Sequence, residues 1–266
     1  MSTSGYVDTN GLSMYYEEAG QGRPLVLLHG AFSGSQSSFG AYIPELARGR
    51  RVISLEMQGH AHTADIDRPL RVATMAQDVV GALAKLGVEQ ADFLGYSMGG
   101  GIALEIAIRH PQLVRKAVVA SAGYNPGSFH PGLLEGMSQL KPEYLVGSPW
   151  HDEYARTAPD PEHFPVLVEK IIDLNQNLPE LTQAEVSSIQ APVLLVSGDS
   201  DVVLEHMVQF FRLLGGGVFG DTPAGLPRCQ LAVLPGTSHT MMVDRADMLL
   251  PILRRFLDGP ELAPPG

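Results

Sequence analysis

The most chemically specific stretch of this sequence is residues 95–100, which read GYSMGG. An apolar, strand-like segment precedes it and an apolar, helix-like segment follows it. A Gly-x-Ser-x-Gly pentapeptide in that context places its serine on a sharp turn that lifts the hydroxyl clear of the sheet. The alternative is a glycine-rich turn with an incidental serine, which the flanking strand and helix disfavour. We therefore expect Ser97 to be a nucleophile.

A serine nucleophile needs a base, and His239 is the best-placed histidine. It follows the strand-like residues 230–234 and precedes the last helical segment. Catalytic residues of open α/β sheets collect in such loops at strand ends. By itself, His239 could equally be a histidine of a surface loop. Its place after Ser97 and after a suitable acid makes a catalytic role the better interpretation.

The acid is expected from residues 198–201, which read GDSD and follow another apolar strand. We assign Asp201 as the residue that orients His239, with Asp199 entering a helix or bracing the loop. The other common place for the acid, after the preceding strand, holds residues 121–125 (SAGYN) and offers no carboxylate. The order serine, acid, histidine fits a nucleophile on a strand-to-helix turn.

Alternating strands and helices must position these residues. The pair Asn10-Gly11 predicts a hairpin turn between strand-like flanks from Tyr6 to Tyr16. Short continuous apolar runs are typical of strands buried on both faces of a parallel sheet. Expected strands cover residues 25–28, 51–55, 91–95, 117–120, 192–196 and 230–234, and expected helices cover about 72–86, 98–109, 204–214 and 241–257. The alternation predicts a mainly parallel α/β sheet with helices on both faces.

Residues 124–190 interrupt this alternation. Seven prolines lie between residues 126 and 165, no clear strand is visible, and residues 166–172 have a helical pattern. Their apolar content is too high for a disordered loop, which is the alternative. We expect a helical cap (a lid) inserted into a core formed by residues 1–123 and 191–266.

Composition excludes several classes of protein. Of the 266 residues, 44% are hydrophobic and 18% charged, and the net charge is −11. Such an acidic chain is unsuited to binding nucleic acid, and it has no run of basic residues that could bind an anionic membrane surface. Neither a secretory signal nor an apolar span of membrane length is visible. One cysteine, Cys229, suits a reducing compartment, so we expect a cytoplasmic protein.

Over nearly its whole length the chain resembles the α/β-hydrolase superfamily. The motifs are the LHG of residues 28–30 after a strand, GYSMGG, GDSD and the GTSH of residues 236–239. It looks most similar to small, lidded bacterial esterases, enol-lactonases and carbon–carbon bond hydrolases. The resemblance implies an oxyanion hole made by the backbone N–H groups of Ala31 and Met98, with no cofactor.

One motif departs from the family pattern. Where the family often has Asp-x-x-Gly-His-Gly-x-Ser, residues 56–63 read EMQGHAHT. This element is usually structural, so we expect activity to be retained. His60 and His62 could be a metal pair, but the sequence near them supplies no further ligand cluster, so we expect no metal. A serine at position 97 disfavours dehalogenase and epoxide hydrolase chemistry, which need an aspartate nucleophile.

The predicted cap bears on the substrate. It has ten acidic and three basic residues, a field that does not favour anions. Carbon–carbon hydrolases and enol-lactonases of the family act on substrates that bear a carboxylate. We therefore expect a neutral, mostly apolar ester. Expected pocket walls, each also compatible with ordinary packing, are Phe32, Met137, Tyr144, Trp150, Phe164 and Met241.

The function predicted from sequence is a serine carboxylic-ester hydrolase that works through an acyl-enzyme. Two alternatives remain at this point. One is a lactonase or carbon–carbon bond hydrolase that uses the same three residues. The other is a ligand-sensing protein with a vestigial triad. The expected partner is a small ester or lactone, and the sequence leaves the oligomeric state open.

Overall fold

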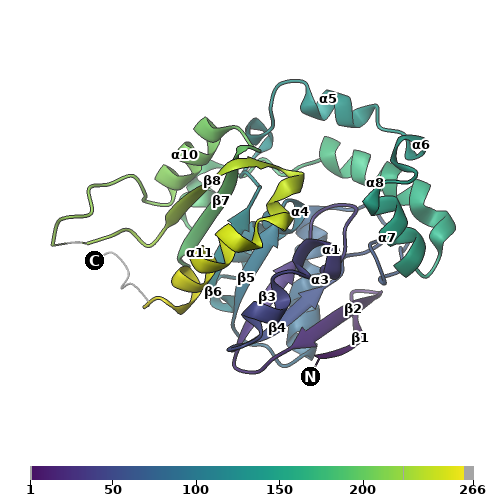
Figure 1. Ribbon diagram of the computed structural model, residues 1–266, viewed down its shortest axis with the longest axis horizontal. Coiled ribbons are helices and arrows are strands. Elements are labelled where there is room, and N and C mark those ends of the chain that lie inside the picture. The colour runs from purple at the N-terminus through teal and green to yellow at the C-terminus, as the bar shows by residue number, and fades with distance from the viewer. Residues whose placement is uncertain (1, 224, 261–266) are drawn as a thin grey trace.

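The computed structural model describes residues 2–223 and 225–260, and its centre is one eight-stranded sheet (Figure 1). The strand order is β1-β2-β4-β3-β5-β6-β7-β8. β2 is antiparallel to β1 and β4, and all other neighbours are parallel. The mainly parallel α/β sheet is therefore confirmed. The strands are β1 (Ser2–Thr9), β2 (Leu12–Ala19), β3 (Arg23–Leu28), β4 (Arg50–Leu55), β5 (Ala91–Tyr96), β6 (Val114–Ala120), β7 (Val193–Ser200) and β8 (Gln230–Ser238).

The central strands are apolar on both faces because helices cover both. In β3, Leu25 and Leu27 belong to one apolar core, and Val26 and Leu28 belong to the other. Successive side chains of a strand point to opposite faces, so a strand buried on both sides must be continuously apolar. The core that contains Val26 and Leu28 includes residues of α3 (Val72–Lys85), α4 (Met98–Arg109) and α10 (Leu204–Leu213). The core that contains Leu25 and Leu27 includes residues of α1 (Ser35–Phe39), α2 (Ile43–Leu46) and α11 (Ala246–Asp258).

The predicted hairpin is present at the N-terminal edge of the sheet. Asn10 and Gly11, between β1 and β2, have φ values of 47° and 81°. Both central residues of a type I′ turn need positive φ, which asparagine and glycine tolerate best.

Residues 124–190, called the cap below, contain helices and no strand. They lie beside the end of the sheet in Figure 1. The cap is tied to the core by Lys170, whose Nζ lies 2.6 Å from Asp65 Oδ2, and by Asp173, whose Oδ2 lies 2.5 Å from Arg71 Nη1. Its elements are η2 (Pro126–Ser128), α5 (Leu133–Ser138), α6 (Pro142–Leu145), α7 (Pro149–Thr157), η3 (Pro161–His163), α8 (Phe164–Gln176) and α9 (Gln183–Ser187).

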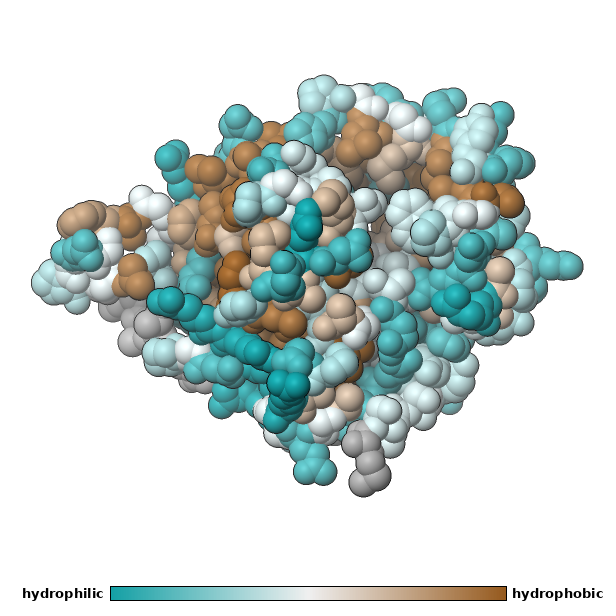
Figure 2. All heavy atoms as spheres, in the orientation of Figure 1, coloured by the Kyte–Doolittle hydropathy of each residue, from teal (hydrophilic) through white to brown (hydrophobic). Residues whose placement is uncertain are grey.

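The cap buries only part of its apolar content. Figure 2 shows hydrophobic residues at the surface of the cap around α5 and α6. Leu133 is 45% exposed there and Val146 is 65% exposed. By contrast, α8 buries Leu167, Val168 and Ile171, which explains its helical pattern in the sequence.

The end of the chain differs from the sequence prediction. β8 extends to Ser238, and the single helix expected over residues 241–257 is wrong. Instead, η4 (Thr240–Asp244) is followed by α11, with a break at Arg245 (φ −93°, ψ 33°). The Arg245 guanidinium donates to the carbonyl of Gly236 at 2.7 Å and to Thr237 Oγ1 at 3.2 Å. The break thus lets Arg245 bind the end of β8, directly before His239. A further short helix, η1 (Pro111–Leu113), joins α4 to β6.

Candidate active site

Ser97 lies on a strained turn between β5 and α4. Its φ of 54° and ψ of −117° are unfavourable for a residue with a side chain and cost on the order of 1–3 kcal/mol. Two backbone hydrogen bonds hold the turn: the Ser97 amide donates to Ala120 O at 2.9 Å, and the Gly99 amide donates to His29 O at 3.1 Å. The surrounding strands therefore stabilise a conformation that the turn would not adopt alone.

The glycines around Ser97 are required by close backbone contacts. A Cβ on Gly95 would lie 2.1 Å from Gly99 O, and a Cβ on Gly99 would lie 2.0 Å from Leu28 O. Both contacts are with backbone atoms that cannot move aside. The strand, the turn and the helix can approach this closely only when both positions lack side chains.

Ser97, His239 and Asp201 form one hydrogen-bonded chain. His239 Nε2 lies 2.9 Å from Ser97 Oγ, and its Nδ1 lies 2.7 Å from Asp201 Oδ1. The His239 side chain is 43% exposed, whereas the Asp201 side chain is fully buried. With Nδ1 donating to the carboxylate, Nε2 is free to accept the serine proton. The arrangement can therefore activate Ser97 as a nucleophile.

Ser121 is a functional residue that the sequence analysis missed. Its hydroxyl donates to Asp201 Oδ2 at 2.5 Å, and the Gly198 amide donates to the same oxygen at 3.3 Å. Like Ser97, Ser121 has a positive φ, of 56°. Its place directly after β6 was the available signal, because a polar residue at that strand end lies beside the acid that follows β7.

Asp199 braces the loop that carries His239, the second of the two roles expected for it. Its carboxylate accepts hydrogen bonds from the Gly236 amide at 2.9 Å and the Thr237 amide at 3.2 Å. These two amides, Gly236 first, lower the pKa of Asp199 below its ordinary value. The residue therefore stays charged while it fixes the end of β8.

The two amides expected in the oxyanion hole belong to the residues that follow Ser97 and Gly30, and a Cβ on Gly30 would lie 3.4 Å from Ser97 Cβ. Met98 is the first residue of α4, and Ala31 is in the loop after β3. Among the described residues, neither amide donates a hydrogen bond to another protein group. An amide at the first position of a helix has no partner within that helix, so Met98 N–H is available to a ligand.

His29 fixes the turn that presents Ala31. Its Nε2 accepts a hydrogen bond from the Met57 amide at 2.9 Å, so its Nδ1 carries the proton and donates to Gly30 O at 2.7 Å. Complete burial, more than any other influence, lowers the pKa of His29 to about 4. The imidazole is thus neutral at pH 7 and acts as a structural bridge rather than as an acid or base.

The motif at residues 56–63 forms hydrogen bonds around Glu56. Its carboxylate accepts hydrogen bonds from the Ser35 amide at 3.1 Å and from the His62 amide at 2.9 Å, and it lies 2.9 Å from His62 Nδ1. His60 is fully buried, and this burial lowers its pKa to about 4. Within residues 2–223 and 225–260, no group of three or more potential ligands could hold a metal ion.

The six residues expected to line the substrate pocket have different surroundings. Phe32 and Trp150 pack together, with ring centroids 6.2 Å apart, and so join the cap to the loop after β3. Phe164 is buried against Tyr154 within the cap. Met137 is half-buried, Met241 is 38% exposed and Tyr144 is 69% exposed, so Tyr144 offers the least enclosed surface.

The described residues include no helix that is both long and apolar enough to cross a membrane.

Comparison with known proteins identifies the family. A family model described as alpha/beta hydrolase fold matches residues 23–212. A 2-hydroxymuconate semialdehyde hydrolase of Pseudomonas sp. (strain CF600) is 30% identical over 181 residues, which are 57% of this chain and 64% of that protein. The matched segment is thus less than two thirds of that relative's length.

Two solved structures share the fold. A serine hydrolase involved in carbazole degradation (CarC) has a TM-score of 0.74 at 22% identity, covering 97% of this chain and 99% of that one. The carboxylesterase CesB from Bacillus subtilis has a TM-score of 0.71 at 22% identity, covering 98% and 93%. The resemblance inferred from the sequence motifs is confirmed. This chain belongs to the alpha/beta hydrolase fold family.

Proposed function

We propose that this protein hydrolyses small, neutral, mostly apolar carboxylic esters through an acyl-enzyme on Ser97. The observation that carries the proposal is the continuous relay from Ser97 through His239 to the buried Asp201. Such a relay is the minimal apparatus for acyl transfer at neutral pH.

The reaction starts when Ser97 Oγ attacks the acyl carbon and His239 Nε2 takes the hydroxyl proton. Asp201 stabilises the imidazolium that results, and the amides of Ala31 and Met98 donate to the negatively charged oxygen of the tetrahedral intermediate. His239 then returns the proton to the leaving alcohol. In the second half, His239 deprotonates a water molecule that attacks the acyl carbon. The bond from this carbon to Ser97 Oγ then breaks, His239 returns the proton to Oγ, and the carboxylic acid is released.

A neutral substrate is supported by the charges of the cap. The cap has ten acidic and three basic residues. Of the three cations, Lys170 is already engaged: its Nζ donates to both oxygens of Asp65, at 2.8 and 2.6 Å. Lys141 and Arg156 are exposed at the surface. A substrate carboxylate would therefore meet an unfavourable field.

The contact between Phe32 and Trp150 supports an apolar acyl or alcohol group. Phe32 follows the proposed oxyanion donor Ala31, and Trp150 is the second residue of the cap helix α7. Aromatic side chains in this place would contact the part of the substrate next to the reacting carbon. Met137, Tyr144, Phe164 and Met241 remain proposals as pocket residues.

A second candidate is hydrolysis of a carbon–carbon bond or of a lactone with the same triad. The observation in its favour is the 30% identity to a 2-hydroxymuconate semialdehyde hydrolase. That activity would need a cationic partner for a carboxylate-bearing substrate, and the cap offers only the cations described above.

A substrate panel tests the proposal. We would compare kcat/KM for p-nitrophenyl acetate and butyrate, a neutral lactone, and a vinylogous keto-acid. We expect kcat/KM for the neutral esters to exceed that for the keto-acid by at least about tenfold, because the acidic cap disfavours a carboxylate. A tenfold ratio corresponds to about 1.4 kcal/mol of transition-state stabilisation. A faster reaction with the keto-acid would overturn the ester proposal in favour of the second candidate.

A further inference from the structure

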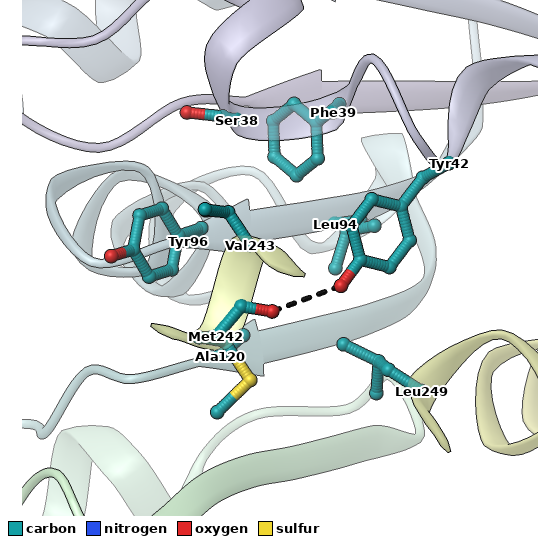
Figure 3. Close-up of a pocket in the computed structure, with 9 residues that line it drawn as sticks. All are labelled: Ser38, Phe39, Tyr42, Leu94, Tyr96, Ala120, Met242, Val243 and Leu249. Carbon is teal, nitrogen blue, oxygen red and sulfur yellow. Dashed lines mark hydrogen bonds between the residues drawn. The ribbon is translucent and has the colours of Figure 1, made fainter. Parts of the chain in front are cut away.

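Two buried tyrosines donate hydrogen bonds to the backbone of the segment that carries His239. Tyr96 Oη donates to the carbonyl of His239 itself at 2.8 Å. Tyr42 Oη donates to the carbonyl of Met242, three residues further along, at 2.9 Å (Figure 3). Within the part of the chain that the structure describes, the only other hydrogen bond to the His239 carbonyl is a longer one of 3.3 Å from the Met242 amide. Tyr96 therefore provides the shorter of its two hydrogen bonds.

Unlike Tyr42, Tyr96 also adjoins the nucleophile turn and the loop that presents Ala31. Tyr96 immediately precedes Ser97, so its backbone is part of the nucleophile turn. A Cβ on Gly30 would lie 2.8 Å from the Tyr96 ring, which shows how closely the ring packs under the loop that presents Ala31. The Tyr96 and His239 rings have centroids 5.5 Å apart. Tyr96 thus joins the nucleophile through its backbone, and it contacts the oxyanion loop and the base through its side chain.

The hydroxyl of Tyr96 is suited to permanent donation. Burial, with a smaller contribution from the charge of Asp201, raises its pKa above the ordinary value. Tyr42 has a raised pKa for the same main reason, burial. Both hydroxyls therefore keep their protons throughout the pH range in which His239 works, and both hydrogen bonds persist.

We propose that Tyr96 is a positioning residue for the reaction, holding the His239 backbone so that Nε2 stays within hydrogen-bond distance of Ser97 Oγ. The inference rests on the proposed function, because it assigns to Tyr96 a part in the proton transfer between these two groups. The Tyr96 hydroxyl contacts the backbone of His239, and the Tyr96 backbone continues into Ser97. Tyr96 does not itself exchange protons in the reaction.

The test compares Tyr96→Phe with Tyr42→Phe. Each variant removes one buried hydroxyl that donates to a carbonyl of the same segment, and each keeps its ring. We expect Tyr96→Phe to lower kcat for p-nitrophenyl acetate by about tenfold or more with KM unchanged, since small displacements of a catalytic group cost up to about 10²-fold. Tyr42→Phe should leave kcat within about twofold. Thermal unfolding should show both variants folded, with similar losses of stability.

A second measurement does not depend on turnover. In proton NMR, the Nδ1 proton of His239 should exchange with solvent faster in Tyr96→Phe than in the wild type, and at the wild-type rate in Tyr42→Phe. If the wild type cleaves no ester, the proposed function fails, and this exchange rate still tests the positioning role. Equal effects of the two substitutions would mean that the hydroxyls only stabilise the segment, and no effect of Tyr96→Phe would mean that its bond does not position His239. Either result would overturn the proposal.

Discussion

Ser121 and Asp201, 80 residues apart in the sequence, are joined by a hydrogen bond of 2.5 Å from the serine hydroxyl to Oδ2. The carboxylate is buried and uses its other oxygen for His239. A buried carboxylate keeps its orientation only while both oxygens have partners. Ser121 thus adds a fourth side chain to the relay, through its hydrogen bond to Asp201.

Replacing Ser121 with alanine should weaken catalysis without preventing folding. Asp201 would lose a hydrogen bond to a charged group, worth about 1.5–3 kcal/mol, and would retain the longer bond from the Gly198 amide. We expect kcat for a neutral ester to fall by about tenfold with little change in KM, measured by steady-state kinetics. Ser200→Ala is the matched control, because that hydroxyl is exposed and contacts Asp199 at 3.4 Å. An unchanged kcat in Ser121→Ala would contradict the role assigned to Ser121.

The protein should lose stability in mild acid. Burial lowers the pKa of His29 and of His60 to about 4, below the ordinary 6.5. The unfolded chain therefore binds protons that the folded chain does not, so stability is fully present above pH 6.5 and is lost as the pH falls toward 4. The expected loss is roughly 3 kcal/mol for each imidazole. It is measured by urea unfolding at pH 7.5 and pH 4.5.

His60→Asn separates this effect from general acid unfolding. The asparagine cannot gain a proton, so the fall in the free energy of unfolding between the two pH values should be smaller than in the wild type. The same fall in both proteins would show that His60 does not cause it.

The attachment of the cap to the core should depend on Lys170. Its ammonium donates to Asp65 and also to the carbonyls of Ile66 at 2.8 Å and Arg68 at 3.0 Å. Because Asp65 is largely buried, Lys170→Met should cost about 2 kcal/mol of unfolding free energy, less than for a fully buried pair. Urea unfolding measures this cost. Lys141→Met, at an exposed position of the cap, should change it by less than about 0.5 kcal/mol. Equal costs for the two variants would contradict the assignment.

The residues of the relay were predictable from the sequence because each of them comes at or near the end of its own strand. Ser97, Asp201 and His239 each come at or near the end of a recognisable apolar run, and parallel strands bring such ends to one edge of the sheet. The sheet was predictable for the same reason, since strands buried on both faces leave an unbroken apolar signal.

The features that the sequence analysis missed depend on contacts between distant residues. The hydrogen bond from Tyr96 to the His239 carbonyl spans 143 positions, and an aromatic residue in that motif is compatible with ordinary core packing. The break at Arg245 was missed because the helical pattern continues across it. Only the folded positions of Gly236 and Thr237 show why Arg245 leaves the helix.

Ser97→Ala provides the most direct test of the central claim, that Ser97 is the nucleophile of an acyl-transfer reaction. The wild type should turn over p-nitrophenyl acetate and gain the mass of a fluorophosphonate on the peptide that contains Ser97. The variant should fold normally, should not be labelled, and should lose at least about 10⁴-fold in kcat, as expected when a triad nucleophile is removed. Undiminished turnover by Ser97→Ala, or labelling of the wild type at another residue, would contradict the account.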